Sequence, residues 1–465
     1  MTLRRRDLLA LMGSSAVGLS AADALATGHV VRRNVAIIGG GSAGTYAALR
    51  LRDQGKSVVI LERSERLGGH AETYRDPGTG APIDIGVIIF PDIALVRNYF
   101  ARFGVPLINP PQGGGGSSKF VDFRTGAAVD AFNPSPAELG AALQTYFQLV
   151  TGPFAFLAQS GYQLPESGPL LDQLLLPFGK FAEQHGLKAL LPLFFLYAQG
   201  FGTLLETPAV YILKNLGPEV MAGILTGAFV VVPTGVGSLY DAATEELASD
   251  VLFGASVVKV IRPTRGPVSI ITTTASGPKL IQADKVLFTA PPTTANLCVF
   301  DLDPEESRIF GRFNPNHYFT AVVETQGLAP DLSLVNAAAK TPANLAPLPG
   351  IYSVSPSPIP GLTNVKFGSD TALSDRTVRS AIRSSLERVK LPGVGPISVD
   401  GFATFKSHSP FALMVSPADI RRGFYKSLEN LQGRRKTFYA GATFQTHSSA
   451  SIWAYIEELL PRLSA

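Results

Sequence analysis

Three glycines stand where an apolar run gives way to a helix-compatible stretch. Gly39, Gly41 and Gly44 have the spacing G-x-G-x-x-G, directly after the apolar residues 35–38 and before residues 45–54, which are compatible with a helix. In a strand-turn-helix unit, such glycines permit a tight turn and let the backbone approach a pyrophosphate, while the helix N-terminus offers free N–H groups and partial positive charge. The pattern therefore predicts a binding site for the phosphates of a dinucleotide.

An acid follows at the distance that such a site requires. Residues 57–61 form a second apolar strand that ends in Glu62, 23 residues after Gly39. A carboxylate at this point accepts hydrogen bonds from both ribose hydroxyls and repels a 2′-phosphate. A glycine-rich turn without a ligand is the alternative, and it does not account for the strand, the helix and the acid together.

The composition excludes several classes of function. The net charge is +4, and Arg4, Arg5 and Arg6 supply three of the positive charges, so we expect no nucleic-acid partner. Cys298 is the only cysteine and the six histidines are scattered, so we expect no disulfide and no metal site. With 465 residues, of which 46% are hydrophobic, the chain can bury a core spread over two or three lobes.

The first 26 residues resemble a signal for export. Arg5 and Arg6 precede an apolar, small-residue stretch that ends in A-x-A at residues 24–26, and the start resembles the twin-arginine motif. We expect a periplasmic or extracellular protein; a frayed basic terminus is the alternative. Residues 189–205 and 220–240 are apolar but are interrupted by proline and glycine, so we expect no transmembrane segment after the signal.

The residues after Glu62 carry a family resemblance. Arg66, Gly68, Gly69 and His70 are similar to the R-x-G-G-R motif of the amine oxidase and phytoene desaturase superfamily, with histidine in place of the last arginine. The resemblance implies FAD as the cofactor, held by a Rossmann-type domain. It also implies that His70 donates a hydrogen bond near the pyrophosphate and the flavin; a covalent histidyl–flavin bond is the sharper alternative.

Later segments are similar to the same superfamily in the same order. Asp84 and Gly86 correspond to a return of the chain beside the flavin, residues 233–239 to the turn P-x-G-G-x-x-x-L, and residues 255–292 to a β-meander that turns at 265–267 and 276–278 before a buried strand at 285–290. The resemblance implies contacts with FAD from these residues: Gly39, Gly41, Ser42, Ala43, Gly44, Glu62, Arg63, Arg66, Gly68, Gly69, His70, Asp84, Gly86, Val257, Val258, Gly441, Ala442, Ser449 and Ser451.

The C-terminal part departs from the amine oxidases. Ala440 and Gly441 close a short predicted strand at 438–441, but Ala442 and Thr443 follow where the amine oxidases have an acid that binds the ribityl chain. The predicted helix at 450–460 can instead present backbone N–H groups near Ser449–Ser451 to the flavin. With this departure, the chain looks like the β-cyclopiazonate dehydrogenase-like branch and is more distantly similar to the polyenoic fatty acid isomerases.

The resemblance implies an α/β fold in which a GR2-like, Rossmann-type FAD-binding domain is joined to a mixed-sheet substrate domain and an apolar helical cap. We assign residues 1–26 to the signal, 30–105 with 230–300 and 431–465 to the FAD-binding domain, 106–229 to the cap, and 301–430 to the substrate domain. Residues 135–230 are apolar on nearly every predicted helix face, as in a deep core or the wall of an apolar pocket. Residues 110–119 are glycine-rich and predict a flexible edge of the entrance.

These features predict an enzyme whose flavin carries the chemistry. His447 and Tyr318 are the catalytic candidates, with His408 as a further polar candidate, and each has a structural alternative as a hydrogen-bonded residue. We expect hydride transfer from a C–H or C–N bond of a small, largely apolar organic substrate to flavin N5, with oxygen or another acceptor taking the electrons. A redox-neutral double-bond isomerase of a fatty-acid-like substrate and a flavin-containing binding or chaperone protein are the alternatives.

Overall fold

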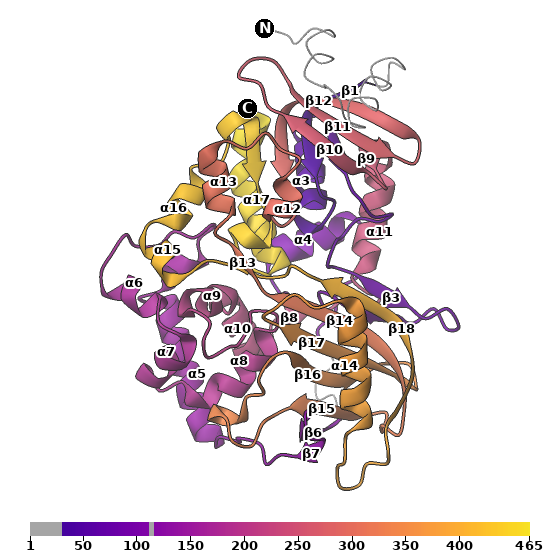
Figure 1. The fold of residues 1–465 in the computed structure, drawn as a ribbon, viewed down its shortest axis with the longest axis vertical. Helices are drawn as coiled ribbons and strands as arrows, with labels where there is room; N and C mark the ends of the chain where they lie inside the picture. Colours follow the sequence, from indigo (N-terminus) through magenta and orange to yellow (C-terminus); the bar gives the residue numbers. More distant parts are fainter. Residues whose placement is uncertain (1–29, 111–115) are drawn as a thin grey trace.

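The computed structural model describes residues 30–110 and 116–465, and the predicted signal at 1–26 lies outside them. The described chain has a mixed α/β fold with two large sheets and a group of helices beside them (Figure 1). Figure 1 shows the first sheet at the top, the second sheet at the lower right, and the helices α5 to α10 at the lower left. The predicted fold class is confirmed.

The first sheet has seven strands, and the glycine turn follows its strand β1. In spatial order the strands are β10 (Ser256–Ile261), β11 (Val268–Thr274), β12 (Gly277–Phe288), β1 (Val30–Ile38), β2 (Val58–Leu61) and β9 (Val251–Leu252), with β20 (Thr437–Tyr439) paired to β12. β1 runs parallel to both β12 and β2, and the last four residues of β1 are buried. A continuous apolar run is what a parallel strand covered on both faces requires.

Helices from both ends of the chain cover this sheet. α3 (Ser42–Asp53) follows the glycine turn, and the C-terminal helix α17 (Ser449–Ser464) lies against α3. The other helices outside the helical part and the second sheet are α4 (Ala94–Arg102), α11 (Gly237–Leu247), η3 (Ala248–Asp250), α12 (Thr294–Leu297), α13 (Pro304–Phe310), α15 (Pro417–Arg421), α16 (Phe424–Glu429), η5 (Arg434–Lys436) and η6 (Ala442–Phe444).

The second sheet also has seven strands, and its two faces differ. In spatial order the strands are β18 (Ser398–His408), β14 (His317–Gln326), β17 (Leu362–Ser369), β16 (Gly350–Pro356), β15 (Leu332–Asn336), β6 (Ser117–Asp122) and β7 (Ala127–Ala128). Phe319, Val323 and Phe367 pack with residues of α14 (Asp375–Glu387) in one apolar cluster. Because side chains alternate along a strand, residues 318, 320 and 322 of β14 point to the opposite face.

Short pieces connect the two sheets. The hairpin β3 (Thr73–Arg75) and β4 (Pro82–Asp84) packs Ile83 against Val322 of the second sheet. The pairs β5 (Phe90–Pro91) with β8 (Phe229–Val230), and β13 (Asn314–Pro315) with β19 (Leu413–Met414), are also antiparallel. The face of β14 that turns away from α14 is therefore covered by the segment that follows the glycine doublet.

The helical part matches the expectation for residues 135–230. It contains α5 (Pro136–Thr151), η1 (Ala155–Ala158), α6 (Pro169–Leu174), α7 (Phe178–Gln184), η2 (Lys188–Leu190), α8 (Leu191–Tyr197), α9 (Ala209–Asn215) and α10 (Pro218–Thr226). Lys214 in α9 is buried, and its Nζ donates to the carbonyl oxygens of Leu157 at 2.9 Å and Gln159 at 2.6 Å. Across residues 30–110 and 116–465, no helix combines the length and apolar character needed to cross a bilayer.

Two expectations need correction. Residues 117–119, which we expected in a flexible edge, begin β6, and β6 pairs in parallel with β15. Backbone hydrogen bonds to this neighbouring strand fix residues 117–119, although a glycine-rich sequence precedes them. Residues 111–115 of that sequence lie outside the described part. The buried strand expected at 285–290 is the end of a longer strand, β12, because the third strand of the meander continues without a break into the centre of the sheet.

Candidate cofactor site

The glycine turn after β1 brings backbone close to backbone. Gly39 has φ +106°, and a Cβ placed on Gly44 would lie 2.0 Å from the carbonyl oxygen of Gly39. A Cβ placed on Gly41 would meet nothing closer than Gly69 Cα, at 3.9 Å. Gly44 is thus required by the protein's own packing, whereas Gly41 faces open space at the start of α3, where the phosphates are expected.

The glycine doublet lies directly on this turn. Gly68 N donates to Gly40 O at 2.8 Å, and a Cβ on Gly69 would come within 3.0 Å of Gly41 Cα. The predicted contact of Arg66 with the cofactor stays a prediction; its guanidinium donates to the carbonyl oxygens of Leu67 and Ala71 and pairs with Glu72 at 2.7 Å. Arg66 therefore holds the doublet in shape from behind.

Glu62 stands at the same edge of the sheet. Its carboxylate accepts from Gly40 N at 2.6 Å and from the amide and hydroxyl of Ser64 at 2.8 and 2.7 Å. Since a carboxylate has about four acceptor positions, a ribose hydroxyl can use the free one or replace the hydroxyl of Ser64. Arg63 beside it is exposed, and Val257 and Val258 lie in β10; their contacts with the cofactor stay predictions.

Asp84 and Gly86 fix the chain next to His70. The Asp84 carboxylate accepts from Thr73 Oγ1 at 2.5 Å and from Val236 N at 2.9 Å, which fastens the β3–β4 hairpin to the turn before α11. Burial raises the pKa of Asp84. A Cβ on Gly86 would lie 1.6 Å from His70 O, so only glycine permits this approach. Asp84 thus holds together the backbone segments that surround the site.

The C-terminal segment closes the same edge. Gly441 has φ +107° and packs against Thr289, whose hydroxyl donates to Gly39 O at 2.8 Å. Trp453 Nε1 of α17 donates to Ser42 Oγ at 2.9 Å, which joins the C-terminal helix to the first turn of α3, where Ala43 is buried. The cap of α17 is Ser448, which accepts from Ser451 N; the predicted contacts of Ala442, Ser449 and Ser451 with FAD stay predictions.

The three histidine candidates come together although they are far apart in the chain. The rings of Phe411 and His447 are stacked at 3.9 Å between centroids, the rings of His70 and His408 are 4.3 Å apart, and Phe411 is 5.8 Å from His70. Tyr318 lies 5.0 Å from Phe411. We call these five residues the histidine cluster. It forms where the doublet, the second sheet and the segment before α17 meet.

The imidazoles of the cluster carry no charge at neutral pH. Burial is the main cause that lowers the pKa of His447 to about 3 and that of His70 to about 4, and it holds the pKa of His408 well below its usual value. Arg66 and Arg63 lower the pKa of His70 further. The three rings can therefore donate or accept single hydrogen bonds as neutral groups.

His70 combines dense surroundings with an exposed surface. Protein atoms surround its ring, and this burial is the main cause of its lowered pKa. The residue nevertheless has a solvent-exposed surface. A side chain that lines an internal cavity has both properties. The ring therefore lies between the glycine doublet and the second sheet, as expected for a residue that touches a bound group.

Tyr318 is placed differently from the histidines. Its hydroxyl donates to Gln199 Oε1 at 2.8 Å, and burial raises its pKa well above the usual range. A Cβ on the neighbouring Gly200 would lie 2.4 Å from Phe411 and 3.1 Å from Tyr318. Tyr318 thus fastens the helical part to the second sheet, and its predicted catalytic role, like that of His447, stays a prediction.

The sequence reading missed three residues of this region: Thr289, Phe411 and Lys366. Thr289 follows the buried end of β12 and Phe411 follows a serine-proline pair, so neither carries a motif. Lys366 had a signal, because a lysine interrupts the apolar residues of β17, and its Nζ is buried with no hydrogen-bond partner among the described residues.

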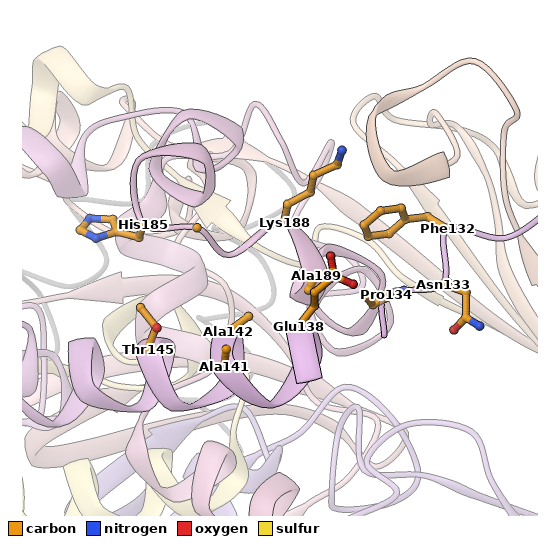
Figure 2. A pocket seen from close by; sticks show the side chains of 11 residues that line it. Phe132, Asn133, Pro134, Glu138, Ala141, Ala142, Thr145, His185, Lys188 and Ala189 are labelled. Atoms are coloured by element: carbon orange, nitrogen blue, oxygen red, sulfur yellow. The ribbon is translucent and has the colours of Figure 1, made fainter. Parts of the chain in front are cut away.

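A separate pocket of about 460 Å³ opens in the helical part. Figure 2 shows its lining side chains on α5, on the segment before it and around η2, among them His185 and Lys188. None of the residues expected to contact FAD lines this pocket. The pocket is therefore distinct from the site formed by the glycine turn and the histidine cluster.

The open backbone at Gly41 and Gly69, beside an acid and a helix N-terminus, fits the pyrophosphate and ribose of FAD. A family model described as flavin containing amine oxidoreductase matches residues 42–331. The chain belongs to the flavin-containing amine oxidoreductase family. The family resemblance and the cofactor predicted from the motifs are confirmed, and the protein is an FAD-dependent oxidoreductase.

Relatives of this flavin-containing amine oxidoreductase cover nearly its whole length. The FAD-dependent oxidoreductase dpasF of Apiospora sacchari is 36% identical, and beta-cyclopiazonate dehydrogenase of Aspergillus oryzae is 31% identical, each over 98% of both chains. Among solved structures, the CLA-producing fatty acid isomerase from P. acnes is similar with a TM-score of 0.76 and 21% identity, covering 92% of this chain and 98% of that one. Putrescine oxidase bound to putrescine has a TM-score of 0.66 at 16% identity, covering 93% and 99%. These structures share the fold.

The glycine turn generates a test that separates binding from folding. We expect Gly41→Ala to leave the free energy of unfolding of the flavin-free protein within about 1 kcal/mol of wild type, because the added Cβ meets no protein atom closer than 3.9 Å. The same methyl should obstruct the phosphates and raise the dissociation constant for FAD at least about tenfold, as measured by fluorescence titration. Gly44→Ala is the contrast, since its methyl collides with Gly39 O and should prevent folding. Wild-type FAD affinity in Gly41→Ala would contradict the phosphate assignment.

The histidine cluster predicts acid sensitivity of the flavin-free protein. In the unfolded chain a histidine has a pKa near 6.5, whereas the folded pKa is about 4 for His70 and about 3 for His447. The unfolded state therefore binds more protons below pH 6.5, and stability present above that pH is lost as the pH falls towards 4. His447→Gln should flatten this decline, by on the order of 3 kcal/mol at pH 4, in urea unfolding monitored by tryptophan fluorescence. Between pH 7.5 and 9 the pH dependence of the two proteins should coincide; an unchanged acid decline in the variant would contradict the protonation assignment.

Proposed function

We propose that this FAD-dependent oxidoreductase takes a hydride from a C–H or C–N bond of a small, largely apolar organic molecule, and that oxygen or another acceptor then receives the electrons. FAD, when bound, supplies the hydride-accepting ring. The observation that carries the proposal is the histidine cluster, in which uncharged imidazoles lie against Phe411 and Tyr318 beside the glycine doublet. Such a wall accommodates an uncharged substrate, because the rings of the cluster bring no charge of their own.

Two exposed aliphatic side chains support an apolar substrate. Ile88 is 45% exposed and Ile108 is 46% exposed, which is unusual for isoleucine. Ile88 follows Gly86, whose backbone lies against His70, and Ile108 is paired with Val231 next to β8. Side chains of this kind are covered when an apolar ligand binds between them.

The residues of the chain have three tasks in this proposal. The glycine turn and Glu62 bind the dinucleotide, Phe411 and the packed helices exclude water, and His447 donates or accepts a hydrogen bond as a neutral imidazole beside the reacting carbon. A folded pKa of about 3 makes His447 a weak base. His447 therefore orients the substrate, and a group with a higher pKa transfers the proton.

Redox-neutral isomerisation is the second candidate, because the CLA-producing fatty acid isomerase has a similar fold. Its sequence identity to this chain is only 21%, however, whereas the dehydrogenase relative is 31% identical over 98% of both chains. We therefore place dehydrogenation first. A binding or chaperone protein without turnover disagrees with the oxidoreductase family of this chain, so it is kept only as an outcome that the experiment would reveal.

Anaerobic turnover distinguishes the three functions. Purified holoprotein is mixed with β-cyclopiazonate or with linoleic acid without an electron acceptor, and the visible flavin band and the products are followed. Dehydrogenation predicts bleaching of the band and about one product per flavin. Sustained conversion without net bleaching supports isomerisation and contradicts the proposal, and a stable band with no product for either probe, or for further apolar cyclic probes, favours a binding protein.

We further propose that residues 1–26 direct export through a twin-arginine route, which carries folded, cofactor-loaded protein. The replacement of both Arg5 and Arg6 by lysine keeps the charge but removes the paired guanidinium groups. We expect the double variant to accumulate uncleaved inside the producing cell, while wild type appears outside the cytoplasm without its first residues. Fractionation followed by mass determination of the N-terminus measures this, and equal distribution of the two proteins would contradict the export proposal.

A further inference from the structure

Lys366 lies on the face of the second sheet that turns towards the glycine doublet. In β17 it pairs with Thr320 of β14, and cross-strand partners point to the same face. Its neighbours Val365 and Phe367 belong to the apolar cluster on α14, so Lys366 points away from that helix. Thr320 Oγ1 in turn lies 3.4 Å from His408 Nε2. The lysine thus belongs to the same face as the histidine cluster.

The amine of Lys366 has no partner in the described part of the chain. Its Nζ is buried, and neither a hydrogen bond nor an ion pair within 4.0 Å reaches it there. The nearest opposing charge that acts on it is Asp84, and that carboxylate already accepts from Thr73 and Val236. Burial lowers the pKa of Lys366 to about 8, so the amine carries a proton through neutral pH.

Two other lysines show what is unusual about this one. Lys406 also pairs with Thr320, from the other side, and its Nζ contacts Glu72 Oε1 at 2.7 Å. Lys214 is as deeply buried as Lys366, but three carbonyl oxygens accept from it. A buried ammonium group without partners is costly, and its retention is explained if a bound group supplies the missing acceptor.

We propose that Lys366 is a ligand-binding residue of this site, whose ammonium group donates a hydrogen bond and brings a positive charge to an electron-rich oxygen or nitrogen atom of the bound group. The acceptor belongs either to the edge of the flavin ring or to a carbonyl or enolate oxygen of the substrate. The inference rests on the proposed function only for the second source. The first source needs FAD alone, so the two can be tested apart.

Among the described residues, Lys366 is the cation on this face of the second sheet that has no ion-pair partner. His408 and His70 are neutral at pH 7, Asp84 is bound by the hairpin and the turn, and Lys406 and Arg66 are paired with Glu72. Loss of the proton from Lys366 therefore removes the one positive charge of this face that no carboxylate of the described residues pairs with.

Sulfite tests the flavin source. This anion adds to the oxidised ring and bleaches the visible band, and its affinity rises when the protein places positive charge at the ring. If Lys366 serves the ring, K366M should raise the dissociation constant of sulfite at least about tenfold at pH 7, and K366R should restore it to within about threefold. K406M, the matched variant on the other side of Thr320, should stay within about twofold of wild type.

Acetylacetone, whose enolate carries electron-rich oxygens, tests the substrate source. If Lys366 serves a substrate oxygen, sulfite binding in K366M stays as in wild type, while the spectral change caused by acetylacetone weakens at least about tenfold in K366M and not in K406M. If K366M does not fold, K366Q replaces it with the same expectations, since glutamine keeps a donor but no charge. Equal behaviour of the Lys366 variants and K406M in both titrations, at full flavin content, would overturn the inference, and it would do so whether or not turnover is found.

Discussion

The site depends on two segments whose backbones touch without side chains between them. The glycine turn after β1 and the doublet at residues 68–69 share the hydrogen bond from Gly68 N to Gly40 O, and a Cβ on Gly69 would come within 3.0 Å of Gly41 Cα. A side chain at Gly69 would press the doublet away from the turn. Because the same bare amides are what a pyrophosphate approaches, the packing that folds the segment also prepares the cofactor site.

The second sheet takes its orientation from this contact. Arg66 and Gly86 shape the chain that leaves the doublet, and the β3–β4 hairpin then lies against one face of β14. That face is the one whose residues are not needed to pack α14, so it is free to carry polar groups. Because side chains alternate along β14, one face of the sheet packs against α14 and the other face meets the cofactor-binding segments.

The local parts of the site could be predicted from the sequence, and its long-range contacts could not. The strand-turn-helix unit and the acid at Glu62 are encoded within about 30 residues, and the structure has them at the expected positions. The glycine-rich sequence misled the prediction for residues 117–119, because pairing with β15, more than 200 residues later, decides the conformation of these three residues. Similarly, His408 and His447 each read as an isolated polar residue, and His70 reads only as the end of the doublet motif. Only the crossing of three segments turns them into one cluster.

The charges of the two sides of the site are complementary to different parts of one bound molecule. At the glycine turn, a helix N-terminus and open amides lie where the phosphates are expected, and the nearby Arg66 shares the carboxylate of Glu72 with Lys406. At the histidine cluster, burial keeps three imidazoles uncharged, so a proton there is expensive, whereas Lys366 keeps its proton to about pH 8. A reaction that builds negative charge on the ring or on a substrate oxygen would be stabilised from the side of Lys366, and a cationic substrate would be repelled from it. This difference supports the proposal of an uncharged, largely apolar substrate.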